Sequence, residues 1–275
     1  MLIVGSALKG YAIEASDGRI GTVKTFLFDD RTWKIRWLVI DTGTWLTGRQ
    51  VLIHPSAIGQ PDHEEQHLPV HLTKAQVEAS PDIQQDQPVT MQMQSHLYGY
   101  YGWDPLWGPD FYGAGMSGMG MAGLGASGLG MAGLGMGGGS GTPYLSEARE
   151  MDADTMQRGD EDGDPHLRSM TAVRGYHIHA TDGSIGHVEN FLLDDATWAI
   201  RYLIIDTRNW WPGAHVLVSP YAVASIDWDE NQIRLNVSRN QVKTSPPWDP
   251  VAVVDEIYEQ RLHGHYGWPG YGWAP

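Results

Sequence analysis

The sequence predicts a mainly β protein in which two small tandem barrels, each followed by one or two short helices, are joined by a glycine-rich linker. The strongest observation is an internal repeat, because residues 10–55 return as residues 175–220 at an offset of 165 positions (175 − 10), without a gap. The second observation is that short apolar runs in each copy are separated by Asp-Gly and Asp-Asp turns, which is typical of a small, strongly curved sheet or barrel. We therefore assign residues 1–103 to a first domain, 104–170 to the linker and 171–275 to a second domain.

Each copy is expected to begin with a hairpin and a long strand pair. In the first copy a strand over residues 11–14 leads to Asp17-Gly18, a pair that accepts the positive φ angles of a tight hairpin turn. The next strand covers residues 20–28, and a turn leads to a third strand over residues 33–40 with one wholly apolar face. The second copy repeats this pattern 165 residues later.

Two more strands and short helices complete each copy. The strands are expected over residues 51–53 and 68–72 of the first copy. A Thr or Ser then precedes a short helix-forming run that a proline closes, over residues 73–81 and again over residues 238–246. A second short helix is expected before each aromatic end, most clearly over residues 253–262. Because duplicated units with matching surfaces tend to associate self-complementarily, we expect the two copies to pack as a pseudo-twofold pair.

Composition disfavours several classes of function. The formal net charge is −15, from 33 acidic and 18 basic residues, and an acidic surface repels a phosphate backbone, which disfavours nucleic acid as a partner. The chain has no cysteine, so it holds neither a disulfide nor a thiolate metal site. The first eleven residues carry no basic leader of the secretory kind, and we expect a cytoplasmic protein.

The middle of the chain differs in kind from the two copies. From Gly115 a five-residue unit rich in glycine and methionine recurs, and no charged residue lies between Asp110 and Glu147. A membrane-inserting helix packed through small residues is one interpretation. Residues 115–139, however, hold twelve glycines against three leucines and five methionines, so we favour a flexible linker and do not expect a membrane partner.

Two groups of polar residues are candidates for a catalytic or metal site. Asp29–Asp30 and Asp194–Asp195 could form an acid–base dyad, but their place in a hairpin turn before Thr-Trp favours capping of the turn backbone. A second group, His63, His67 and His71, has the spacing of metal ligands on a helix. Pro69 interrupts that run, which ends in an expected strand, so a solvated loop and edge strand is favoured.

We therefore predict no catalytic, cofactor or metal site, and no enzyme.

Aromatic residues at the end of each copy are the candidate partner-binding residues. They extend past the point where a small barrel should be complete, and tyrosine and tryptophan suit both a strap over a barrel and an exposed adhesive surface. We favour a strap for residues 98–103 and 266–268, and leave both interpretations open for residues 107–112 and 271–273. The candidates are Trp103, Trp107, Phe111, Tyr112, Trp268, Tyr271 and Trp273.

Several short motifs shared by the copies carry a family resemblance. They are Gly-Tyr, Asp-Gly-x-Ile-Gly, Phe-Leu, Asp-Asp-x-Thr-Trp, Ile-Arg-x-Leu, Asp-Thr and Val-Leu-x-x-Pro. With this set the chain resembles the PRC-barrel family, which includes the cytoplasmic part of the photosynthetic reaction centre H subunit and a domain of a ribosome maturation factor. The resemblance covers most of residues 6–103 and 171–272 and implies two PRC-type β-barrels. Because it consists of fold-forming residues, it is specific for the fold and uninformative about function.

The expected function is that of a non-catalytic protein-binding or assembly module, whose partner is an unidentified protein or a second copy of the chain. The alternative, which rests only on the resemblance, is an accessory subunit of a membrane electron-transfer complex like the reaction centre H subunit. RNA-related maturation, which the resemblance also implies, fits poorly with the acidic charge.

Overall fold

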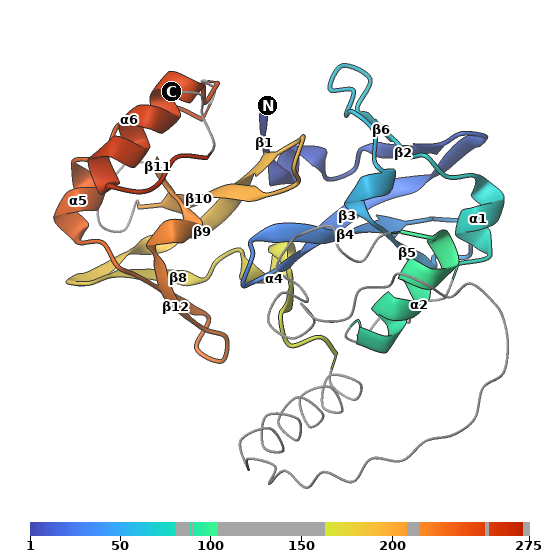
Figure 1. The fold of residues 1–275 in the computed structure, drawn as a ribbon, viewed down its shortest axis with the longest axis horizontal. Coiled ribbons are helices and arrows are strands. Elements are labelled where there is room, and N and C mark those ends of the chain that lie inside the picture. The colour runs from blue at the N-terminus through green and yellow to red at the C-terminus, as the bar shows by residue number, and fades with distance from the viewer. Residues whose placement is uncertain (81–88, 90, 104–162, 208–214, 251–252, 272–275) are drawn as a thin grey trace, which may run out of the picture. The chain divides into compact units, whose positions relative to one another are not determined.

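The computed structural model describes residues 1–80, 89, 91–103, 163–207, 215–250 and 253–271 (Figure 1). The chain divides into two compact units, Met1–Asp86 with His166–Pro275, and Gln87–Pro165. The two repeated blocks, residues 10–55 and 175–220, both belong to the first of these units, whereas residues 87–103 of the predicted first domain belong to the second. The second unit contains the helix α2 (Met91–Tyr101). Residues 104–162 of the predicted flexible linker, which include its glycine- and methionine-rich segment, lie outside the described residues.

The first copy forms a mixed sheet with the strand order β5-β4-β3-β2-β6. Neighbouring strands are antiparallel except β2 and β6, which are parallel. A 3-10 turn, η2 (Pro55–Ala57), follows β5, and a short helix, α1 (Lys74–Glu78), follows β6. The strands are β2 (Ala12–Ala15), β3 (Gly18–Asp29), β4 (Lys34–Asp41), β5 (Gln50–Ile53) and β6 (His67–Pro69).

The second copy forms the corresponding sheet, with one more strand, in the order β11-β10-β9-β8-β13-β12. Only β8 and β13 are parallel. Its strands are β8 (His177–Ala180), β9 (Gly183–Asp194), β10 (Ile200–Asp206), β11 (His215–Val218), β12 (Val223–Asp227) and β13 (Gln232–Leu235). Its other elements are η3 (Pro220–Ala222), α5 (Arg239–Lys243) and α6 (Glu256–Tyr266).

The mainly β class is thus confirmed, but within the described residues the strand pairings close neither sheet into a barrel. Two mixed sheets stand where the sequence predicted two closed barrels. Closure would require the two end strands of a sheet to pair, and in the second copy β11 and β12 do not. Among the described strands, β12 therefore pairs with β13 on one side and has no strand partner on its other edge.

Local sequence signals account for the individual elements. Thr73 and Ser238 each form a capping box with the glutamine three residues on, which starts α1 and α5 as predicted. Helix α6 begins after Asp255, whose side chain accepts a hydrogen bond from the backbone of Tyr258, and it ends at Gly267 with φ = 72°. Gly186 has φ = 144°, and a Cβ there would collide with the carbonyl oxygen of Asp206 on the neighbouring strand.

The two copies exchange strands. The first three-residue strand, β1 (Leu2–Val4), pairs with β9 of the second copy, and the matching segment of the second copy, β7 (Leu167–Ser169), pairs with β3 of the first. Figure 1 shows β1 beside β9. A short helix, α4 (Met170–Val173), follows β7. Residues 167–170, which we assigned to the linker, therefore belong to the folded unit.

The centre of the junction between the copies is nearly symmetric. The backbone N–H of Ile35 donates to the carbonyl of Trp198 at 2.8 Å, and the N–H of Ile200 donates to the carbonyl of Trp33 at 2.7 Å. These bonds are equivalent under the offset of 165. Around them Phe28 stacks on Trp33 with ring centroids 5.4 Å apart and meets Phe191 at 6.0 Å. The reciprocal contacts are the pseudo-twofold association that the duplication predicts.

Candidate functional site

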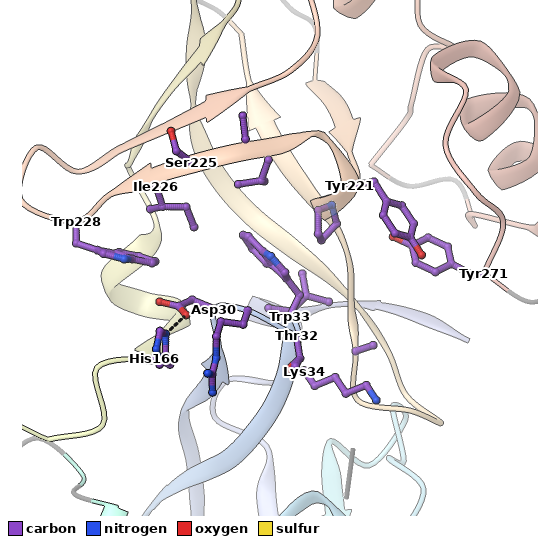
Figure 2. Close-up of a pocket in the computed structure, with 16 residues that line it drawn as sticks. Asp30, Thr32, Trp33, Lys34, His166, Tyr221, Ser225, Ile226, Trp228 and Tyr271 are labelled. Carbon is purple, nitrogen blue, oxygen red and sulfur yellow. Dashed lines mark hydrogen bonds and ion pairs between the residues drawn. The ribbon is translucent and has the colours of Figure 1, made fainter. Parts of the chain in front are cut away.

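A groove of about 700 Å³ lies at the junction of the two copies, within the first compact unit. One wall is residues 30–34, the turn after β3 with the first residue of β4, and the other is formed by residues 220–221 of η3 and 223–226 of β12 (Figure 2). His166, Trp228 and Tyr271 line the ends. The size falls in the range of ligand-binding clefts, roughly 300–1,000 Å³. We call this feature the junction groove.

Aromatic side chains from both copies line the junction groove. Trp33 comes from the first copy and is buried, and Trp228 comes from the second and is half-buried. In Figure 2 the two indoles lie on opposite sides of the gap. Tyr221 is 45% exposed and stacks on Tyr271, with ring centroids 5.5 Å apart at an interplanar angle of 27°. Large aromatic surfaces that remain accessible in a concavity are typical of binding sites.

The charges of the junction groove come from both copies. Asp30 accepts a hydrogen bond from His166 Nδ1 at 2.9 Å and one from Arg168 Nε at 3.2 Å. The guanidinium of Arg168 also lies 4.1 Å from the centre of the Trp228 ring, a cation–π contact that holds this indole in place. The negative charge of Asp30 is thereby balanced by the guanidinium of Arg168. The remaining cations of this wall, Arg31 and Lys34, come from the same turn.

The aspartate pairs of the sequence analysis divide between two structural roles. Asp29 Oδ1 accepts hydrogen bonds from the backbone N–H groups of Arg31 and Thr32 at 3.0 and 2.9 Å, as expected for turn capping. Its Oδ2 contacts Arg36 Nη1 at 3.2 Å. Asp30 and Asp195 instead join the copies, because Asp195 pairs with the N-terminal ammonium at 2.5 Å just as Asp30 pairs with His166. The structure gives both pairs structural contacts.

The three histidines at four-residue spacing lie apart from the junction groove. They do not share a helix, since His67 is in strand β6, and His63 Nδ1 is 3.0 Å from the hydroxyl of Tyr11. In the part of the chain that the structure describes, no group of three or more His, Asp or Glu side chains is placed to hold a metal ion. Across those same residues no helix is both long and apolar enough to span a bilayer.

A buried polar network beneath α6 was missed by the sequence analysis. The hydroxyl of Tyr202 donates to Glu259 Oε1 at 2.9 Å and lies 2.8 Å from His263 Nε2, while His263 Nδ1 donates to the carbonyl of Pro269 at 2.6 Å. All three side chains are buried. Burial raises the pKa of Tyr202 above its usual value and lowers the pKa of His263. These groups fasten α6 and the chain after it to the sheet.

A signal for this network is present in the repeat. The positions that match Tyr202, Glu259 and His263 at the offset of 165 hold Trp37, Gln94 and Tyr98. All three positions differ between the otherwise similar copies, as expected of side chains that contact one another in the second copy.

The candidate partner-binding aromatics divide into three groups. Trp103 stacks on Tyr101 with centroids 4.1 Å apart, and Trp268 stacks on Tyr266 at 4.0 Å, so each packs on its own copy's helix end. Tyr271 lines the junction groove, where its hydroxyl bonds Ser219 Oγ at 2.7 Å. The other four candidates, Trp107, Phe111, Tyr112 and Trp273, lie outside the described residues.

Comparisons with known proteins add no identification. No known family model matches the chain, and no curated protein sequence matches it. The resemblance to the PRC-barrel family stays a prediction.

Proposed function

We propose that the chain is a non-catalytic binding or assembly module and that the junction groove is its recognition surface. The observation that carries this proposal is the position of the groove: its walls come from both copies, and an exposed Tyr221 and a half-buried Trp228 line it. We further infer that each mixed sheet is an opened form of the PRC-type barrel expected from the sequence, because both copies share the strand order around a parallel pair.

The polar groups nearest the groove support a binding role rather than a catalytic one. Asp30 is held by His166 and Arg168, and its neighbour Asp29 is held by the turn backbone and Arg36. A general base needs a carboxylate or imidazole that is positioned towards a substrate proton. The groups of this wall are instead occupied with fixing the turn and the indole, which is what a rigid recognition surface requires.

The proposal is tested by affinity capture from the native host with cross-linking, together with sedimentation of the purified chain. A double variant, Tyr221→Ala with Trp228→Ala, removes the accessible aromatic surface of the groove. The matched control is Ile257→Ala, which removes an apolar side chain that is 67% exposed on α6. We expect the partner, or self-association, to be lost in the double variant and kept in the control. If the double variant and the control keep the partner or the self-association equally, with unchanged circular dichroism, the proposal is contradicted.

A further inference from the structure

We propose that the junction groove takes an extended peptide segment, which adds as a strand to the open edge of β12 and places a carboxylate beside Arg31 and Lys34. This inference rests on the proposed function of the groove as the recognition surface and specifies the chemistry of the partner.

The backbone of β12 provides the first part of the site. This strand is last in its sheet, and its ladder bonds run to β13 on one side. A strand paired on one side carries a row of N–H and C=O groups along its other edge, which can pair with a further strand about 4.8 Å away. Residues 223–226 of β12 line the groove. The open edge is therefore at the groove rather than on a flat exterior face.

The walls of the groove provide contacts for the side chains of such a segment. Successive side chains of a strand point to opposite faces, so an added strand presents alternate side chains to the two sides of the gap. In Figure 2, Ile226 and Trp228 lie on one side of the gap and Trp33 on the other. Apolar side chains with a period of two would meet these aromatic surfaces. The recognition mode is that of strand addition, in which backbone bonds supply affinity and alternate side chains supply specificity.

The charge of the wall formed by residues 30–34 indicates which charged side chain the segment should carry. Arg31 is 54% exposed, and its nearest carboxylate oxygen, on Asp29, is 3.7 Å away. Lys34 lines the same wall, while Asp30 is neutralised by His166 and Arg168. In a chain with a net charge of −15 this wall is locally cationic. It favours a carboxylate on the segment.

The end of β12 at Asp227 is acidic. The strand ends at Asp227, and Asp229 and Glu230 follow in the turn to β13. Like charges repel, so carboxylates of the segment are disfavoured at this end. A carboxylate of the segment is therefore favoured beside Arg31 and Lys34 and disfavoured beside Asp227.

A single segment fits this place better than a second copy of the chain. The turn of residues 30–34 lies across the groove from β12 (Figure 2). A second sheet that approached edge-on would meet this turn before it reached the backbone of β12. One extended chain is the narrower occupant.

The test uses a display library of random twelve-residue peptides, selected on the full-length protein. Selected peptides are made with a fluorophore, and binding is measured by fluorescence anisotropy. We expect apolar residues at alternate positions and Asp or Glu at one end. Charge reversal at Lys34 should weaken binding by about tenfold. The control Lys243→Glu, an exposed lysine of α5 outside the groove, should leave binding unchanged.

Backbone N-methylation of the peptides tests strand addition itself. A strand bonds its neighbour through every second residue, so methylation should weaken binding at alternate positions by about tenfold or more and be tolerated at the positions between. Uniform tolerance, or binding that ignores the Lys34 reversal, overturns this inference. So does a dimer that depends on the groove. In each of these cases loss of binding in the Tyr221→Ala, Trp228→Ala variant would leave the proposed function intact, whereas insensitivity to that variant would overturn both.

Discussion

Removal of one hydroxyl, by Tyr202→Phe, tests the buried network that fastens α6 to the second sheet. The side chain of Tyr202 is fully buried, and its hydroxyl contacts Glu259 Oε1 at 2.9 Å and His263 Nε2 at 2.8 Å. Phenylalanine keeps the ring and its packing. The change therefore isolates the polar contacts.

The expected loss follows from what remains after the substitution. His263 keeps the carbonyl of Pro269, and Glu259 keeps Arg201, whose Nη2 is 3.9 Å from Oε2. A buried polar group that loses a partner costs about 1–3 kcal/mol, so the loss of two contacts should lower the free energy of unfolding by about 2–4 kcal/mol. The matched control, Tyr258→Phe, removes one bond of 3.1 Å to the carbonyl of Pro246 and should cost about 1 kcal/mol.

The measurement is equilibrium unfolding in guanidinium chloride, followed by tryptophan fluorescence and circular dichroism. The midpoint should fall while the slope stays constant, since the native and unfolded surfaces change little. If Tyr202→Phe costs no more than Tyr258→Phe, the network does not fasten α6, and the helix is held by apolar packing alone.

Three other changes have expected outcomes. Burial, with a smaller contribution from Arg36, lowers the pKa of His54 from 6.5 to about 4, so the folded chain keeps this imidazole neutral where the unfolded chain protonates. The free energy of unfolding is therefore unaffected by His54 above pH 6.5 and falls as the pH drops from 6.5 towards 4, by about 3 kcal/mol in total. His54→Ser, which introduces the capping residue of the matching position Ser219, should reduce this pH dependence in thermal unfolding, and an unchanged profile would contradict it. Gly186→Ala should cost roughly 3 kcal/mol or more, because the added Cβ meets the carbonyl of Asp206. Gly264→Ala in α6, where the added Cβ meets open space, should instead stabilise the protein by about 0.5–1 kcal/mol. Equal midpoints of the two variants in denaturant would refute this contrast. Trp198→Ala should cost about 3–5 kcal/mol, because this buried indole meets Phe26 across the junction at 5.8 Å, and a loss below 1 kcal/mol would show that the junction contributes little.

Much of the local structure was predictable because it depends on nearby residues. The strand over residues 33–40 follows from its alternating pattern, and the capping boxes at Thr73 and Ser238 follow from spacing alone. The exchange of β1 and β7 was not predictable in this way. Each is a three-residue strand, and nothing local indicates which of two similar sheets it joins.

The open edge of β12 and the junction groove were also missed, for a related reason. Sheet closure depends on whether strands far apart in sequence approach each other, which turn chemistry and periodicity do not report. Of the three candidate aromatics that the structure describes, Tyr271 alone lines the groove, while the residues that complete it, Trp33 and Trp228, read as ordinary strand and turn positions. The groove arises from the association of the copies.

The reciprocal exchange of β1 and β7 makes the two copies interdependent. Neither copy is complete alone, since each sheet includes a short strand that the other copy supplies. A cut anywhere in residues 104–162 would leave two polypeptides that still share these strands and therefore stay together as a noncovalent heterodimer. The covalent connection then contributes effective concentration, by making the encounter of the copies intramolecular. A gene for a single copy would be expected to encode a homodimer of the same architecture, with two identical halves of the junction in place of two diverged ones.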